Sequence, residues 1–161
     1  MFEREIEESI EIAAGPSEVW WQLTNFESYP EWNPFITRID GEVREGARLS
    51  VTLDFHSMPR ITVRPKVIVV DPQRQLRWRG RMGIPNLFDG RHIFTIETTG
   101  VNRVCFKQRE RFSGLFAPGG VSLIERALRR SFREMNEALR QRAEAAHATR
   151  EVARAERAEH R

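Results

Sequence analysis

The chain has 161 residues, a length typical of one domain, and 40% of them are hydrophobic and 30% charged. Its 26 Lys and Arg residues barely outnumber its 23 Asp and Glu residues, which disfavours a nucleic-acid partner because such binding needs clustered positive charge. A single cysteine, Cys105, excludes a framework of internal disulfides and fits a reducing compartment. The acidic N-terminus is unlike a signal peptide, and no apolar run approaches membrane-spanning length. We therefore expect a cytoplasmic protein without integral membrane association.

The first part of the chain predicts a strand and a short helix. Ile6, Ile10 and Ile12 alternate with polar residues over 4–13, as in a strand with one buried face. Pro16 then suits the first position of a short helix with an apolar side.

Two prolines four residues apart mark the next segment, Tyr29 to Pro34. Because proline disfavours helical geometry in the residue before it, we interpret this segment as a stiff, aromatic-rich loop. Alternating segments down to residue 112 then predict six further strands, separated by turns rich in Gly, Pro and Asp. One of these strands spans residues 61–70, and Pro65 marks an edge or a bulge in it.

The stretch from Val121 to Leu139 predicts one long amphipathic helix. Its apolar residues recur every three or four positions: Val121, Ile124, Leu128, Phe132, Met135 and Leu139. Residues 144–161 continue with Ala, Arg and Glu, which form helix readily but have little to bury. We expect a domain of residues 1–143 followed by a charged tail, helical or frayed, over 144–161. The fold class is α+β: seven mostly antiparallel strands, two short helices after the first strand, and the long helix last.

This order of elements resembles the START-like, or Bet v 1-like (SRPBCC), superfamily over roughly residues 4–143. The motifs that carry the resemblance are Glu18-Val-Trp20, Tyr29-Pro-Glu-Trp-Asn-Pro34 and Phe88-Asp-Gly-Arg-His-Ile-Phe94. The most similar branch is that of polyketide cyclases/dehydratases and lipid-transport proteins. The resemblance implies a helix-grip fold, in which a curved sheet wraps the last helix and leaves an apolar cavity that is a usual kind of binding site.

His92 is the most informative candidate for chemistry. Strand alternation places it on the same inward face as Phe94, and the inward face of the next strand carries Gln108 and Glu110. For a turn centred near Gly100, we expect His92 opposite Gln108 and Glu110 one diagonal step away. A His–Glu pair in an apolar cavity can perform acid/base chemistry on a carbonyl compound. The alternative is that the three polar side chains only satisfy one another or a buried water.

The other candidate ligand contacts are a pair in the stiff loop and a set of large apolar side chains. Trp32 and Asn33 cap one end of the cavity and contact the ligand, or else Trp32 packs in the core and Asn33 caps a turn. The apolar set lines the cavity or fills it: Phe55, Trp78, Phe94, Phe106, Phe132 and Met135.

Two strands carry a basic residue at every second position, so that all these residues lie on the outward face. These residues are Arg77, Arg79 and Arg81 on one strand and Lys107, Arg109 and Arg111 on the other. They form a surface for an acidic partner, or they pair with Glu5, Glu7 and Glu11 of the first strand, which the resemblance places beside the last strand. Cross-strand ion pairing is the plainer interpretation.

Three hypotheses for the function follow. The first is a non-catalytic module that binds a lipid, a polyketide or a similar hydrophobic metabolite, with His92, Gln108 and Glu110 orienting a polar group. The second is a cyclase or dehydratase that uses His92 and Glu110 as acid and base. The third is a protein-interaction module with a filled cavity, acting through its outer sheet or its tail. We expect no metal and no cofactor, because the histidines lack metal-ligand spacing and nucleotide motifs are missing. We expect a monomer or a weak homodimer.

Overall fold

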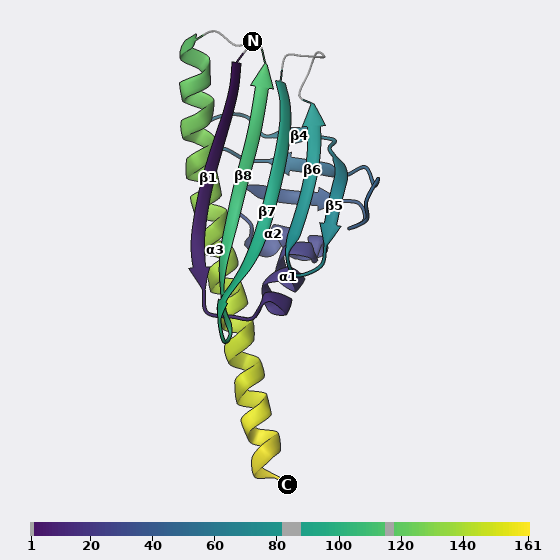
Figure 1. Cartoon of the computed structure of the whole chain (residues 1–161), viewed down its shortest axis with the longest axis vertical. Coiled ribbons are helices and arrows are strands. Elements are labelled where there is room, and N and C mark those ends of the chain that lie inside the picture. Colours follow the sequence, from purple (N-terminus) through teal and green to yellow (C-terminus); the bar gives the residue numbers. More distant parts are fainter. Residues whose placement is uncertain (1, 82–87, 115–117) are drawn as a thin grey trace.

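The structure, a computed structural model, describes residues 2–81, 88–114 and 118–161. Within these residues, two antiparallel sheets face one long helix (Figure 1). The five-stranded sheet has the order β1 (Phe2–Ile12), β8 (Arg103–Gly114), β7 (Phe88–Gly100), β6 (Gln75–Arg81) and β5 (Lys66–Asp71). The three-stranded sheet has the order β2 (Ile36–Asp40), β3 (Ser50–Leu53) and β4 (Ile61–Val63).

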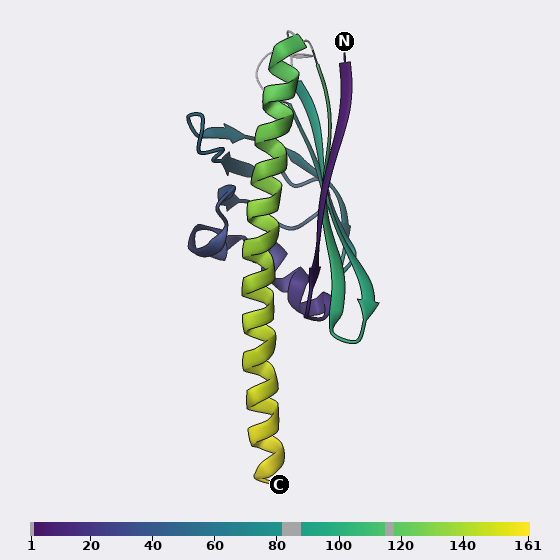
Figure 2. The same ribbon diagram turned by 90° about the vertical axis from the view of Figure 1, so that its left-hand side faces the viewer.

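Helices close the space between the two sheets. Short helical segments follow β1, namely α1 (Pro16–Thr24), the 3-10 turn η1 (Phe26–Ser28) and α2 (Tyr29–Trp32). The last element, α3 (Pro118–Glu159), packs against β1, β8, α1 and α2. Figure 2 shows α3 passing between the large sheet on one side and the small sheet on the other, and its C-terminal turns extend beyond both sheets. The predicted α+β helix-grip architecture is thus confirmed.

The number of strands differs from the prediction. Eight strands are described instead of seven, because the segment expected as one strand over 61–70 divides into β4 and β5, which belong to different sheets. The division falls at Pro65, which has no N–H with which to continue a ladder. The carbonyl oxygen of Pro65 still accepts a hydrogen bond from Leu49 N at 2.8 Å. The backbone therefore keeps a hydrogen bond at the point where it crosses from one sheet to the other.

The segment after α1 also differs from the prediction. We expected residues 29–34 to be a loop, but Tyr29 has helical angles (φ −54°, ψ −40°) and begins α2. Pro30 lies in the first turn of α2, where a missing N–H leaves no helical hydrogen bond unmade. Asn33, which precedes Pro34, is extended (φ −87°, ψ 111°), as the proline predicts.

The predicted apolar stripe of α3 faces the core. Leu128, Phe132, Met135 and Leu139 are all buried, and Phe132 packs its ring against Phe35 at 5.8 Å between centroids. This stripe holds α3 against the sheets and leaves the opposite face to charged residues.

Ion pairs cover the outer face of the large sheet between β1 and β8. Arg109 Nε lies 3.2 Å from Glu7 Oε2, and Arg111 Nε lies 2.8 Å from Glu5 Oε2. The ion-pairing interpretation is confirmed for Arg109 and Arg111. On the other basic strand, Arg79 pairs instead with Asp89 of β7. Such exposed pairs contribute about 0–1 kcal/mol each to stability.

Candidate ligand-binding site

A cavity of about 440 Å³ lies between the two sheets and α3. The small sheet and the loop between its strands β3 and β4 provide one wall, β6 and β7 a second, and α3 a third. Among the described lining residues, the ionisable ones are Arg81, His92 and Glu110, and nearly all the others are apolar. The site is therefore an apolar pocket with a small number of polar groups, the usual form of a small-molecule site.

Two glycines help to hollow the wall that the large sheet provides. Gly80 on β6 pairs directly with Gly90 on β7, and both residues line the cavity. A Cβ atom on Gly80 would lie only 3.3 Å from the Cβ of Pro65, so this position also allows the chain to pass closely. The absence of side chains at this paired position leaves space where two larger residues would fill it.

The pairing of β7 with β8 brings the predicted acid/base residues closer than we expected. His92 lies directly opposite Glu110, and Phe94 lies opposite Gln108, so the predicted register is wrong by two residues. The hairpin turns around Val101, with an irregularity before Gly100 and a left-handed Asn102 (φ 50°). Because the error is an even number, every side chain stays on its predicted face.

The imidazole of His92 contacts two polar side chains of β8. Its Nδ1 lies 3.2 Å from Glu110 Oε2, and its Nε2 lies 3.0 Å from Gln108 Oε1. The ring stacks on Phe94 at 4.2 Å between centroids and also contacts Phe132. His92 and Glu110 are both largely buried, yet both reach the cavity wall.

A buried asparagine extends this network into α3. Gln108 Nε2 donates to Asn136 Oδ1 at 2.8 Å and lies 3.4 Å from the backbone oxygen of Phe132. Asn136 Nδ2 in turn donates to the backbone oxygen of Glu8 at 3.3 Å. Asn136 was not among the site residues that we predicted from the sequence. An asparagine beside the apolar stripe of a long helix is a poor helix former, and this was the available signal.

The structure brings four of the eleven predicted site residues to the cavity wall, namely Phe55, Trp78, His92 and Glu110. The other predicted apolar residues are fully buried in the core and outside the described lining: Phe94, Phe106, Phe132 and Met135. They fill space behind the wall. Gln108 is fully buried as the partner of His92.

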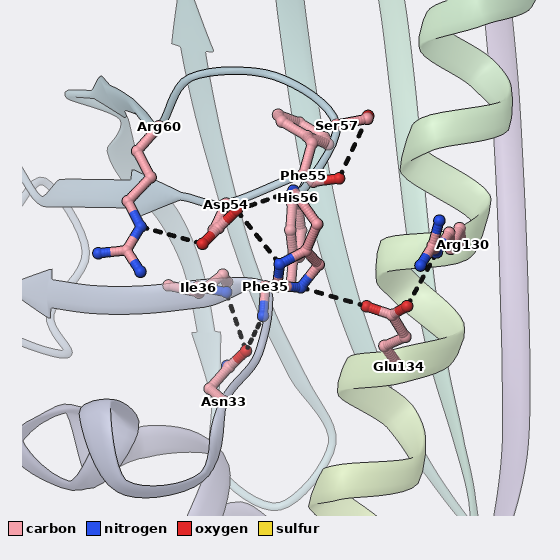
Figure 3. Close-up of polar contacts among 10 residues, drawn as sticks. All are labelled: Asn33, Phe35, Ile36, Asp54, Phe55, His56, Ser57, Arg60, Arg130 and Glu134. Carbon is pink, nitrogen blue, oxygen red and sulfur yellow. Dashed lines mark hydrogen bonds and ion pairs between the residues drawn. The ribbon is translucent and has the colours of Figure 1, made fainter.

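Trp32 and Asn33 lie outside the described lining of the cavity. Trp32 Nε1 donates to Ser28 Oγ at 3.2 Å, and its ring packs edge-on against Tyr29. Asn33 Oδ1 accepts from the backbone nitrogens of Phe35 and Ile36 at 3.0 and 2.8 Å (Figure 3). These contacts match the packing and turn-capping alternatives, and ligand contact by either residue stays a prediction.

The loop between β3 and β4 borders the cavity and is tied to α3 (Figure 3). Asp54 accepts from the backbone nitrogen of His56 at 2.8 Å and from Arg60 Nε at 2.9 Å. The hydrogen bond from His56 N, followed by that from Arg60, lowers the pKa of Asp54. His56 has a left-handed backbone (φ 61°), and its Nε2 lies 3.5 Å from Glu134 Oε2 on α3. We assigned this loop no role from sequence, although an Asp two residues before a turn residue is typical of an Asx turn.

Comparison with known proteins identifies the family of this chain. Residues 3–144 match the family described as "Polyketide cyclase / dehydrase and lipid transport". The chain belongs to this family. No curated protein matches it in sequence.

Several solved structures share the fold. A START superfamily protein from Mycobacterium smegmatis has a TM-score of 0.72 and 18% identity, over 88% of this chain and 98% of that one. The Zhui aromatase/cyclase from Streptomyces sp. R1128 has a TM-score of 0.71 and 18% identity, over 89% and 94%. Norcoclaurine synthase from Thalictrum flavum, in complex with dopamine and hydroxybenzaldehyde, has a TM-score of 0.67 and 16% identity, over 87% and 86%. These similarities show the START-like fold.

Membrane-spanning helices and metal sites are both absent from the residues that the structure describes. None of the helices in this part of the chain is long and apolar enough to cross a membrane. No group of three or more His, Cys, Asp or Glu side chains in the same ranges is arranged to hold a metal ion.

Proposed function

We propose that the chain binds a small, mainly apolar molecule, such as a lipid or a polyketide, in the cavity between its sheets and α3. The observation that carries this proposal is the cavity itself, which measures about 440 Å³ and has an almost entirely apolar lining. Burial of apolar ligand surface provides roughly 25 cal/mol per Å² before the costs of binding. The His92–Glu110 pair on the wall orients a polar group of the ligand.

A second candidate function is acid/base catalysis of the cyclase or dehydratase type. The observation that favours it is that His92 Nδ1 and Glu110 Oε2 lie 3.2 Å apart on the wall of the cavity, within reach of a bound molecule. The third hypothesis, a protein-interaction module, predicts a filled cavity, and the hollow beneath α3 argues against it.

The experiment that tests binding is native mass spectrometry of the purified protein, followed by denaturing extraction. We expect a hydrophobic molecule retained at a defined stoichiometry, and the extract identifies its chemical class. The extracted molecule is then incubated with ligand-free protein. A changed product mass supports the catalytic candidate, and an unchanged molecule supports binding alone.

Ala127 offers a way to close the cavity from α3. It lines the pocket and is only half-buried, so Ala127→Phe directs a ring into the hollow. We expect this variant to fold and to lose the retained molecule. Leu123→Phe is the matched control, because Leu123 is an exposed residue of the same helix, and it should retain the ligand. Equal ligand retention in both variants would contradict the proposed location.

A further inference from the structure

The hydrogen bonds behind the cavity wall determine which wall atoms carry protons. From them we infer that the ligand presents a hydrogen-bond donor, a hydroxyl group, to Glu110. This inference rests on the proposed function and specifies its polar contact. Its basis is a hydrogen-bond network of four side chains that connects α3 with β8 and β7, namely Asn136, Gln108, His92 and Glu110.

This network ends at two backbone carbonyl oxygens, which can only accept hydrogen bonds. Glu8 O faces the amide of Asn136, and Phe132 O faces the amide of Gln108, so the NH₂ groups of both amides point to these oxygens. Asn136 Oδ1 consequently accepts from Gln108 Nε2, and Gln108 Oε1 is left facing His92. This orientation follows from the acceptors, since reversing either amide would place oxygen against oxygen.

The fixed amide of Gln108 determines the protonation of His92. Because Gln108 Oε1 only accepts, His92 Nε2 carries a proton. The other ring nitrogen, Nδ1, lies 3.2 Å from Glu110 Oε2, and one proton belongs between these two atoms. It is either on Nδ1, as an imidazolium beside a carboxylate, or on Oε2, as a neutral pair. In both states, the second carboxyl oxygen of Glu110 has lone pairs and no proton.

Glu110 Oε1 is therefore the acceptor that this network offers to the cavity. It has no partner among the described residues, and Glu110 lines the pocket. A hydroxyl group on an apolar ligand satisfies it. A carbonyl or ether oxygen at the same place would oppose lone pair to lone pair and would leave the carboxyl unpaired beneath an apolar surface.

The test compares two aromatic probes, 2-naphthol and 2-methoxynaphthalene, by calorimetric titration of the full chain. The ether is the more apolar probe, so a site that recognises only apolar surface prefers it. We expect the naphthol to bind about ten- to a hundred-fold more tightly, because the ether leaves the Glu110 oxygen unsatisfied. Equal binding, or preference for the ether, would overturn the inference.

Two substitutions at Glu110 separate hydrogen-bond polarity from charge. In Glu110→Gln, the amide NH₂ donates to Nδ1 of a neutral His92 and the amide oxygen still faces the cavity, so preference for the naphthol should persist. In Glu110→Leu, the acceptor is gone and the preference should disappear. Thermal unfolding of both variants checks that each of them is folded. A Gln variant that loses the preference as completely as the Leu variant would refute the proton assignment.

Nuclear magnetic resonance of ¹⁵N-labelled histidine gives a ligand-free readout. We expect a protonated Nε2 at His92 at neutral pH, and an unprotonated Nε2 would overturn the inference. If both probes fail to bind and no molecule co-purifies, the proposed function itself fails. If a molecule co-purifies, its functional groups test the inference: a ligand without a hydroxyl group overturns the inference while the proposed function stands.

Discussion

Asp54 shows how one side chain holds the loop that borders the cavity. Its two oxygens accept from His56 N and from Arg60 Nε, and its side chain is only 12% exposed. These contacts lower the pKa of the carboxyl below its ordinary value, so the carboxylate stabilises the folded loop. A lowered folded-state pKa means that this stabilisation is complete above about pH 4 and decreases as the pH falls through the lowered pKa.

Replacement of Asp54 by Ala should destabilise the chain by about 1–3 kcal/mol at neutral pH, because His56 N and Arg60 lose their acceptor. The difference between wild type and variant should shrink in acid, and urea unfolding at pH 7 and pH 3 measures it. Asp40→Ala is the control, because the Asp40 side chain is 58% exposed and its ion-pair partner, Arg38, is exposed as well. A loss at Asp54 that does not change with pH would contradict this account of the carboxylate.

At the same scale, sequence predicted that His92 and Glu110 share an inward face, because side chains alternate strictly along a strand. It did not predict their direct pairing, which depends on the left-handed Asn102 in the hairpin turn. Nor did it predict the left-handed backbone of His56, since this conformation depends on a neighbouring side chain, Asp54. Turn geometry is set by few atoms and leaves a weak signal in composition.

The helix α3 is the element whose packing closes the core. Phe132 is fully buried and contacts both Phe35 and the His92 ring. Phe132→Ala should lower the free energy of unfolding by about 3–5 kcal/mol, because the large residue leaves a void and its aromatic contacts are lost. Chemical denaturation measures this loss.

Leu123→Ala is the control for Phe132→Ala, since Leu123 is 61% exposed on the same helix. Its effect should stay within about 0.5 kcal/mol. A cost below about 1 kcal/mol at Phe132 would show that α3 packs through a different face.

The apolar stripe of α3 was predictable because burial of a long helix imposes a period of 3.6 residues. The break at Pro65 shows the opposite case: the sequence indicated an edge or a bulge, but which sheet each half joins depends on tertiary packing.

At the scale of the whole molecule, α3 continues past the family match that ends at residue 144 and runs to Glu159. An ion pair ties this extension to the body: Arg150 Nη2 lies 3.2 Å from Glu18 Oε2, and Glu18 is buried in α1. From Arg154 onward the side chains are exposed. The predicted boundary at residue 143 stays a prediction.

Two truncations distinguish the tied part of the extension from the exposed part. A chain ending at Ala153 should unfold within about 0.5 kcal/mol of the full chain, because it loses only exposed residues. A chain ending at Thr149 should lose about 1–3 kcal/mol, because buried Glu18 is left without its cation. Urea denaturation of the three chains makes the comparison. Equal stability of both truncated chains would show that the Arg150 contact contributes nothing.

The size of the cavity has a consequence for how the protein responds to heat. The cavity of about 440 Å³ is partly open to solvent, and an empty space of this size would forfeit many contacts along its apolar wall. We therefore infer that water or a guest molecule occupies the space, and an apolar wall gives water few hydrogen bonds. Any guest that binds only the folded chain raises the melting temperature in proportion to the logarithm of its concentration once the site is saturated. Thermal melting across a library of hydrophobic compounds thus becomes a direct search for the natural occupant.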